Sequence, residues 1–530
     1  MKTTKPVTLI ILDGYGITLP SKGNAISLAQ KPVIDDLVKH YPHTLLEASG
    51  EVVGLPWGEF GNSEVGHMNI GSGRVMYQDL LRIDKAVQDG SFFSNEALQG
   101  AIKQVKEKGS RLHLVGLVSP GGVHSHLRHL YALLELAQKE GLSEVYIHAF
   151  LDGRDMPPQS GLGIIQELEA KMKELGVGKI ASVAGRYYGM DRDKNWDRVK
   201  KAYDVMVTGQ GSIADSAVTA IEKSYGRKIY DEEFEPVVIA GGQMIGGDDA
   251  VIHFNYRSDR GQQLAGVFVD PEFSGFERLN PASLRDGQDF SNLYFTTLTN
   301  FGLPASLPVK IAFPLDKIKN TLGEVLAQQG LKQLRIAETE KYAHVTNFFN
   351  CGQMDPFSGE DRQLIPSPGV KSYAEKPEMS AYEVTDKFLE LIDNYDFALL
   401  NFANIDMVGH TGDIPATTKA IETVDKCLGK IVKKVQSLGG SLIIAADHGN
   451  ADLMLNLQTD EMMKEHTVNP VPCIIVDENK RSEHPAAGSN TDLSTITPTG
   501  VLSDVAPTVL GLMGIDKPEE MTGMNLSEVI

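Results

Sequence analysis

The sequence predicts an α/β fold in which a second α/β domain is inserted into the first. Short apolar runs, continuous rather than alternating, are typical of strands buried in a parallel sheet. Segments with apolar residues three to four positions apart lie between these runs and predict amphipathic helices. Candidate metal ligands lie near both ends of the chain, on either side of a middle block with strands of its own, so an insertion is the simplest arrangement.

Three apolar runs outside the middle block predict parallel strands that end at one edge of a sheet. They are Val7–Leu12, Phe397–Phe402 and Leu442–Ala446. Each is followed at once, or within a few residues, by an acidic side chain, namely Asp13, Asp406 and Asp447. In open α/β sheets, ligands bind beyond the carboxyl ends of the strands. The three carboxylates are therefore expected to meet.

Helical spacing predicts the elements that cover this sheet. Ala416–Leu438 has apolar residues at the three-to-four spacing of an amphipathic helix. Asp504–Met513 follows the same pattern, and Asp386–Leu391 is a shorter case.

The middle block repeats the α/β pattern. Its predicted strands are Leu112–Val118, Glu144–Phe150, Ile180–Ala184 and Val251–Phe254. Charged and imidazole side chains gather near the ends of these strands: His124, Asp152, Arg154, Asp155, Arg186, Arg192, Arg257 and Arg260. The glycine-rich segment 241–247 does not open a helix after a strand, so we interpret it as a loop.

The domain boundaries follow from this order. We expect residues 1–80 and 312–530 to form a discontinuous metal-binding domain, and residues 81–311 to form the inserted domain. The chain is expected to enter the inserted domain near Met76–Asp84 and to leave it near Pro304–Asp316, where prolines interrupt regular structure.

Length and composition exclude several classes of function. A chain of 530 residues is too long for one compact core, and its 42% apolar and 23% charged content is that of a soluble globular protein. The formal net charge of −20 argues against nucleic acid and anionic membranes as partners. No stretch approaches the roughly 20 apolar residues that a membrane span needs.

Cysteine usage points to a reducing compartment. The three cysteines, Cys351, Cys427 and Cys473, are odd in number and form no C-x-x-C pair. The first apolar run is too short for a signal peptide. We therefore expect a cytoplasmic protein.

Seven residues in two distant blocks have side chains of the kind that bind metal ions. Mixed carboxylate and imidazole ligands suit borderline divalent ions, and two such ions are a standard device for moving a phosphoryl group. Taken singly, Asp406 and His410 could form an exposed helical pair, and Asp447 with His448 a solvated turn. Jointly these interpretations become improbable. The seven residues are Asp13, Ser63, Asp406, His410, Asp447, His448 and His466.

Ser63 and the arginines each have an ordinary alternative interpretation. A lone serine after a glycine turn is most often a helix N-cap. Beside divalent ions its hydroxyl becomes a nucleophile, and a helix N-terminus there favours phosphate. Arginine pairs such as Arg257 and Arg260 are usually solvated ion-pair partners. Their planar guanidinium groups nevertheless match the geometry of carboxylate and phosphate, and a small dianionic substrate would need several such groups.

Six segments, spread over nearly the whole chain, resemble the cofactor-independent phosphoglycerate mutases of the alkaline phosphatase superfamily. They are Asn62–His67, His148–Asp155, Met190–Lys194, Glu338–Thr346, Asn401–Gly412 without Ile405, and Ala446–Ala451. The resemblance implies an alkaline-phosphatase-like metal domain, made from both ends of the chain, with a transferase domain inserted into it.

The resemblance also implies roles for individual residues. One ion would be held by Asp406, His410 and His466, and the other by Asp13, Ser63, Asp447 and His448. Ser63 would be phosphorylated, Lys341 would support the transferring phosphate, and Asp155 is our candidate for carrying the substrate's hydroxyl proton. The expected substrate-binding residues are His124, Arg154, Asp155, Arg186, Arg192, Arg257, Arg260 and Lys341.

The implied activity is interconversion of 3-phosphoglycerate and 2-phosphoglycerate in glycolysis and gluconeogenesis, through a phosphoserine and without 2,3-bisphosphoglycerate. We expect two divalent ions, with Mn²⁺ as first choice and Mg²⁺, Co²⁺ or Zn²⁺ as alternatives. The expected partner is the small phosphoglycerate substrate, bound by a monomer. Closure of the inserted domain would exclude water from the phosphoserine.

Three other functions remain open from the residues alone. A metal-dependent hydrolase would use the same serine but would have no need to retain its leaving alcohol. A mutase acting on a pentose phosphate would use the same metal domain. A non-catalytic anion or metal sensor would not need Ser63 and Lys341.

Overall fold

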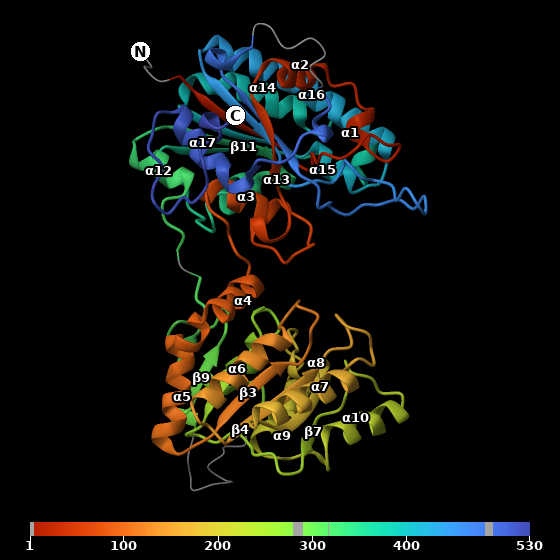
Figure 1. The fold of residues 1–530 in the computed structure, drawn as a ribbon, viewed down its shortest axis with the longest axis vertical. Coiled ribbons are helices and arrows are strands. Elements are labelled where there is room, and N and C mark those ends of the chain that lie inside the picture. Colours follow the sequence, from red (N-terminus) through yellow and green to blue (C-terminus); the bar gives the residue numbers. More distant parts are fainter. Residues whose placement is uncertain (1–4, 279–289, 316, 483–490) are drawn as a thin grey trace. The chain divides into compact units, whose positions relative to one another are not determined.

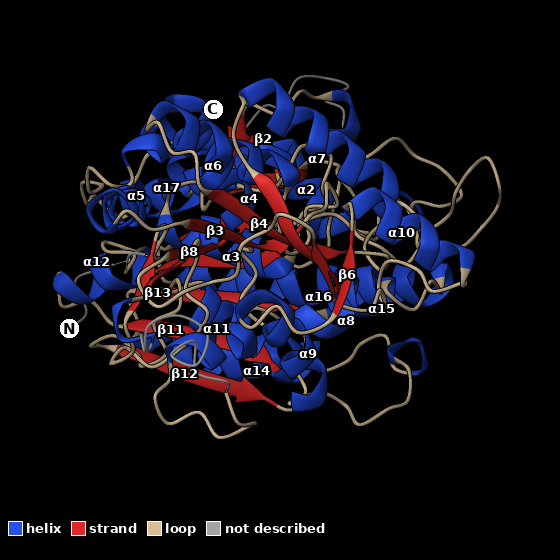
Figure 2. Ribbon diagram, turned by 90° about the horizontal axis from the view of Figure 1, so that it is seen from below, coloured by secondary structure: helices blue, strands red, loops and turns tan. Residues whose placement is uncertain are grey.

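The computed structural model describes residues 5–278, 290–315, 317–482 and 491–530. Its chain divides into two compact units, Met1–Gln78 with Lys317–Ile530 and Asp79–Asp316. The expected crossing Pro304–Asp316 ends on a residue outside this description. Each unit is built around its own sheet, and helices flank the strands of each sheet (Figures 1 and 2). The predicted α/β class, with one α/β unit inserted into another, is confirmed.

The sheet of the first unit has, within the described residues, eight strands in the order β12-β11-β13-β1-β14-β15-β2-β16. Five neighbouring strands, β12, β11, β13, β1 and β14, are parallel to one another. β15 is antiparallel to its two neighbours, β14 and β2. The strands are β1 (Val7–Leu12), β2 (His43–Glu47), β11 (Gln333–Glu338), β12 (Glu360–Ile365), β13 (Phe397–Phe402), β14 (Ser441–Ala445), β15 (Val471–Val476) and β16 (Gly500–Val501).

Register aligns the strand ends that matter for function. Ile11 of β1 pairs with Asn401 of β13 on one side and with Ala445 of β14 on the other. Every residue of β1 and β13 is buried, as their continuous apolar sequences predict. The residues that follow these three strands therefore emerge together at one edge.

The helices of the first unit include the long amphipathic α16, whose apolar side is buried as predicted. A π-helical stretch, His344–Phe348, follows α13. The α-helices are α1 (Ala25–Leu28), α2 (Pro32–His40), α3 (Ser63–Ser72), α12 (Leu322–Gln328), α13 (Thr339–Ala343), α14 (Ala381–Leu391), α15 (Asn404–Gly409), α16 (Ile414–Ser437) and α17 (Val505–Leu512).

The sheet of the inserted unit also has, in the part of the chain described, eight strands, in the order β10-β9-β8-β3-β4-β5-β7-β6. All neighbours are parallel except β5 with β7. The strands are β3 (Leu112–Leu117), β4 (Val145–Leu151), β5 (Lys179–Gly185), β6 (Ser212–Ala214), β7 (Val237–Ile239), β8 (Ala250–His253), β9 (Tyr294–Thr297) and β10 (Val309–Ile311).

Helices lie between most of the successive strands of the inserted unit along the chain. They are α4 (Asp79–Asp89), α5 (Glu96–Lys108), α6 (Leu127–Lys139), α7 (Gly161–Leu175), α8 (Arg186–Gly189), α9 (Trp196–Val207), α10 (Ala217–Gly226) and α11 (Gln262–Val269). Among the described residues, none of the helices combines the length and the apolar sequence needed to cross a bilayer.

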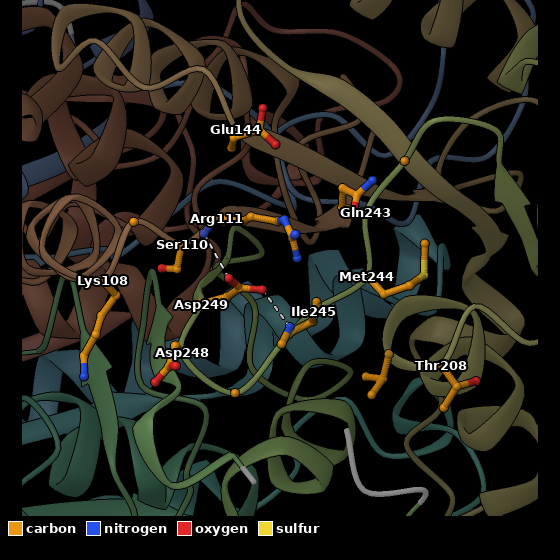
Figure 3. A pocket seen from close by; sticks show the side chains of 15 residues that line it. Lys108, Ser110, Arg111, Glu144, Thr208, Gln243, Met244, Ile245, Asp248 and Asp249 are labelled. Carbon is orange, nitrogen blue, oxygen red and sulfur yellow. Dashed lines mark hydrogen bonds between the residues drawn. The ribbon is translucent and has the colours of Figure 1, made fainter. Parts of the chain in front are cut away.

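A cavity of about 470 Å³ lies where β3, β4 and β8 begin, and the glycine-rich segment 241–247 forms part of its wall (Figure 3). Asp249 anchors this wall, because its carboxylate accepts the backbone N–H groups of Arg111 (2.9 Å) and Gly246 (2.7 Å). The segment contains no helix, which confirms its interpretation as a loop. The charged cluster of the inserted unit lies at the other ends of these strands.

Candidate active site

Three buried carboxylates meet at the carboxyl edge of the first sheet. Asp13 follows β1 directly, Asp447 follows β14 after one intervening residue, and Asp406 lies in α15 after β13. Their exposed fractions are 0% for Asp13, 0% for Asp447 and 2% for Asp406. Such a cluster is costly to bury unless cations neutralise it. The alternative interpretation of Asp406 and His410 as an exposed helical pair is therefore wrong for Asp406.

Ser63 enters this cluster from the first position of α3. The helix N-cap is Asn62, whose side chain accepts the Val65 N–H, so the interpretation of Ser63 as the N-cap is wrong. A β-carbon on Gly66 would lie 2.6 Å from the carbonyl oxygen of Asp447, so only glycine allows α3 to approach this closely. The Ser63 Oγ lies 3.2 Å from Asp13 Oδ1 and 2.9 Å from Nε2 of His448.

Lys341, from α13, places its ammonium group in the middle of the cluster. Its Nζ donates to Asp13 Oδ1 (2.6 Å), to Ser63 Oγ (2.7 Å) and to Asp406 Oδ2 (2.7 Å). Burial alone would lower the pKa of Lys341, but the two carboxylates raise it above its usual range. Burial conversely would raise the pKa values of Asp13 and Asp406, but Lys341 holds both below their usual range.

Three histidines complete the cluster, and each has its Nδ1 next to a backbone carbonyl oxygen. The distances are 2.7 Å from His410 to Lys464, 3.2 Å from His448 to Gly449 and 2.8 Å from His466 to Gly61. Because a carbonyl only accepts, Nδ1 carries the hydrogen, and in the neutral ring the lone pair of Nε2 is left for a metal ion. Backbone carbonyls that contact metal-binding histidines in this way impose this tautomer.

The Nε2 atoms of the three histidines face the carboxylates. Nε2 of His410 and of His466 lie 3.3 and 3.4 Å from Asp406 Oδ1, and 3.1 Å from each other. Nε2 of His448 lies 3.4 Å from Asp13 Oδ1. The rings of His448 and His466 are stacked with centroids 3.9 Å apart. All seven predicted metal-type residues are thus brought together.

The charges of this cluster do not balance without further cations. Three carboxylates face one ammonium group, and Asp447 Oδ2 is buried without a hydrogen-bond donor. Burial would lower the pKa of His448, but Asp447 and the other carboxylates raise it to about 9.

The donor atoms form two overlapping groups that could hold a divalent ion. Atoms of Asp406, His448 and His466 lie within 4.8 Å of one another, as do those of Asp13, Asp447 and His448, so His448 belongs to both groups. Carboxylate and imidazole donors in this number suit Zn²⁺ or Mn²⁺.

A second cluster lies in the inserted unit. Arg186, at the end of β5, donates to Asp152 (2.6 Å) and to Asp155. His124 Nε2 lies 3.9 Å from Asp155 Oδ2, and its Nδ1 is buried without a hydrogen-bond partner. Burial, and then the nearby Arg186, lower the pKa of His124 to about 4, so this imidazole is neutral at pH 7.

Further arginines surround Asp259. Arg192 donates to Asp259 Oδ2 (3.0 Å), and Arg257 Nε lies 3.1 Å from Asp259 Oδ1. Burial lowers the pKa of Arg260, and the neighbouring guanidinium groups of Arg186, Arg192 and Arg154 lower it further. A group of cations this dense is expected to bind an anion with more than one charge.

Arg154 is the most weakly held of the predicted substrate-binding residues. Its side chain is 55% exposed and its Nη1 lies 3.4 Å from Glu232.

The predicted residues form two clusters in two units. The metal-type residues with Lys341 belong to the first unit. The inserted unit holds His124, Arg154, Asp155, Arg186, Arg192, Arg257 and Arg260.

Several polar residues that support these clusters were not predicted. Asn450 donates to Asp406 Oδ1 (2.8 Å), Asn401 donates to Asp13 Oδ2 (2.8 Å), and His67 Nδ1 lies 3.2 Å from Asp447 Oδ2. Asp259 joins three members of the second cluster. The one sequence signal for Asn401 is an amide inside an otherwise apolar strand.

Comparison with known proteins relates both units to described families. Residues 83–302 match the family model described as BPG-independent PGAM N-terminus, and residues 343–498 match type I phosphodiesterase / nucleotide pyrophosphatase. Two curated relatives are each called 2,3-bisphosphoglycerate-independent phosphoglycerate mutase. The one from Moorella thermoacetica is 52% identical over 98% of both chains. The one from Clostridium acetobutylicum is 51% identical over 99% of both.

A solved structure agrees with these relatives. Phosphoglycerate mutase of Leishmania mexicana, crystallised at low cobalt concentration, is 30% identical with a TM-score of 0.55, over 98% of this chain and 97% of that one. Full-length identity of about one half leaves no room for a different family. The chain belongs to the 2,3-bisphosphoglycerate-independent phosphoglycerate mutases.

Proposed function

We propose that this protein interconverts 3-phosphoglycerate and 2-phosphoglycerate by transferring the phosphoryl group to Ser63 and back. The observation that carries the proposal is the position of the Ser63 hydroxyl, which contacts Lys341, Asp13 and His448 at 2.7 to 3.2 Å. An alcohol needs an adjacent base or a cation to become a nucleophile at neutral pH. Full-length identity with named mutases supports the substrate.

Two divalent ions are part of the proposal. Asp406, His410 and His466 would hold one, and Asp13, Ser63, Asp447 and His448 the other. Bound there, the ions would acidify the Ser63 hydroxyl and neutralise charge on the phosphoryl oxygens. The cobalt used with the Leishmania enzyme supports a divalent ion. Mn²⁺ stays our first choice, and a monomeric, cytoplasmic enzyme stays a prediction.

In the first half of the reaction, Ser63 Oγ attacks phosphorus and the bond from phosphorus to the glycerate oxygen breaks. The serine proton leaves to Asp13, whose Oδ1 lies 3.2 Å from Ser63 Oγ. Lys341 donates to Ser63 Oγ and stabilises the charge that spreads over the phosphoryl oxygens.

In the second half, the other hydroxyl of glycerate takes the phosphoryl group from Ser63. The glycerate oxygen that departs in the first half gains one proton, and the glycerate hydroxyl that attacks in the second half loses one. Ser63 Oγ regains its own proton when it departs, so no proton is consumed overall. Asp155 is proposed to carry this proton, as a carboxylate beside the arginines that would hold glycerate. His124 and the arginines would retain glycerate between the two halves of the reaction, because a phosphoserine that has lost its glycerate can only be hydrolysed.

The test is a coupled assay of 2-phosphoglycerate formation from 3-phosphoglycerate, without added 2,3-bisphosphoglycerate. Ser63→Ala is expected to abolish turnover while the melting temperature stays close to that of the wild type. A metal chelator is expected to abolish turnover as well, and Mn²⁺ to restore it. Wild-type turnover by Ser63→Ala would refute the proposal.

A further inference from the structure

His67 and Asn401 are buried polar residues that belong to neither the predicted metal ligands nor the substrate-binding set. Their exposed fractions are 0% and 1%. His67 lies one turn after Ser63 on α3, and Asn401 lies on β13 beside Ile11 of β1. Buried side chains of this kind need hydrogen-bond partners. His67 and the amide nitrogen of Asn401 find them on the groups that surround the reactive serine, whereas the amide oxygen of Asn401 has no hydrogen-bond partner among the described residues.

The partners of His67 fix its tautomer. Its Nδ1 lies 2.8 Å from the carbonyl oxygen of Ser63, which can only accept, so Nδ1 carries the hydrogen. Nε2 is then the acceptor, and the amide nitrogen of Asn401 lies 3.1 Å from it. Both imidazole nitrogens therefore have partners, Nδ1 within α3 and Nε2 on β13, and the Nε2 contact connects the helix with the strand.

The partners of Asn401 fix its amide orientation in the same way. Its nitrogen donates to Asp13 Oδ2 (2.8 Å) and to His67 Nε2, which uses both of its hydrogens. Rotating the amide by 180° would turn its oxygen towards the Asp13 carboxylate and the lone pair of His67, two acceptors.

These contacts close a circuit. It runs from the Ser63 carbonyl to His67, to Asn401, to Asp13, and back to the Ser63 hydroxyl, which lies 3.2 Å from Asp13 Oδ1. Asp13 thus faces the serine with one oxygen and is held by Asn401 with the other. His67 Nδ1 also lies 3.2 Å from Asp447 Oδ2.

We propose that His67 and Asn401 are positioning residues that hold Ser63 and Asp13 in register for phosphoryl transfer and for cation binding. The inference rests on the proposed function of Ser63, and it assigns no direct contact with substrate. Outer partners of this kind alter metal affinity or activity by about 10- to 100-fold when they are removed.

The experiment compares substitutions that open the circuit at different points. Asn401→Leu keeps the approximate volume and removes both hydrogen bonds. His67→Asn keeps a donor near the Ser63 carbonyl and loses the contact with Asn401. His67→Gln keeps the contact with Asn401 and loses the donor to the Ser63 carbonyl. Asn69→Leu is the matched control, because Asn69 is a buried amide on the same helix that bonds only to the backbone outside the circuit.

Two readouts separate positioning from general stability. Mn²⁺ affinity, measured by titration of the metal-free protein, and kcat are expected to fall by about 10- to 100-fold in Asn401→Leu. KM for 3-phosphoglycerate is expected to stay within about threefold, since the arginines belong to the other unit. Asn69→Leu is expected to lower the melting temperature and to leave both readouts unchanged.

A double substitution gives the sharpest result. His67→Gln with Asn401→Leu is expected to be no worse than the more damaging single change, since both open one circuit. Additive losses, or wild-type Mn²⁺ affinity and kcat in Asn401→Leu, would overturn the inference. If Asn401→Leu does not fold, His67→Asn and His67→Gln decide the matter by the same readouts. Activity of Ser63→Ala would instead refute the proposed function, and the Mn²⁺ affinities would still judge the circuit.

Discussion

Replacing Lys341 by methionine tests whether one ammonium group neutralises the carboxylate cluster in the metal-free protein. Methionine has nearly the same length and no charge, so the change removes the contacts with Asp13 and Asp406 at 2.6 and 2.7 Å. Both carboxylates are buried, and removing one partner of a buried ion pair costs about 3–5 kcal/mol. In a unit of this size each kcal/mol corresponds to about 1.6 °C, so the melting temperature should fall by roughly 5–8 °C.

Divalent ions should reduce this deficit, because they would supply the missing positive charge to the same carboxylates. The assay is thermal unfolding of both proteins, first with a chelator and then with saturating Mn²⁺. We expect Mn²⁺ to stabilise Lys341→Met more than it stabilises the wild type. Turnover should still be lower by about 10²–10³-fold, since a donor to the transferring phosphate is lost.

A surface lysine of the same unit provides the control. Lys434 lies 2.8 Å from Asp393, and their side chains are 28% and 52% exposed. Lys434→Met should change stability by less than about 1 kcal/mol, with or without metal. The reasoning would be refuted if Lys341→Met melted like the wild type in chelator, or if its deficit were unchanged by Mn²⁺.

Three further predictions concern other charged groups. Burial raises the pKa of Glu338 to about 7, so the folded protein retains a proton that the unfolded chain loses near pH 4.5, and stability should fall by up to about 3 kcal/mol as the pH rises between these values. Glu338→Gln should remove this slope in unfolding measured from pH 4 to 8, and an unchanged slope would contradict the assignment. Because the pKa of His448 is raised to about 9, Mn²⁺ binding at pH 7.5 should release protons, which calorimetry in buffers of different ionisation enthalpy would detect. Arg257→Ala should lower the mutase rate and increase release of inorganic phosphate from 3-phosphoglycerate, and no change in either would count against retention of glycerate by this cluster.

Strands with continuous apolar sequences could be predicted to within a residue or two. β1 and β13 have the predicted bounds, and β14 begins and ends one residue earlier than expected. β11, in contrast, was not predicted, although all six of its residues are buried. Its sequence contains Gln333, Arg335 and Glu338, which a hydropathy argument assigns to a surface.

Tertiary packing explains how β11 tolerates these residues. The Arg335 guanidinium lies over the rings of Phe349 and Phe397, at 4.7 and 5.3 Å from their centroids. Such cation–π contacts offset part of the desolvation of the charge. Neither ring is close to Arg335 in sequence, so the strand could not be recognised from its own composition.

The active site shows the same difference between residues that have a local sequence signal and residues that are recognised only by their tertiary contacts. Residues whose chemistry suits metal ions could be proposed from their type and from the strand ends they follow. Lys341 came only from the family resemblance, and His67 and Asn401 were missed because their partners lie up to 388 positions away in sequence. Long-range hydrogen bonds leave no periodic signal in a sequence.

The most direct test of the central claim is mass spectrometry of the enzyme quenched during turnover of 3-phosphoglycerate. The account predicts a phosphoryl group on the peptide that contains Ser63, absent after chelation and absent from Ser63→Ala. An enzyme that turns over at full rate with no phosphate on Ser63, or with the phosphate on another residue, would contradict it.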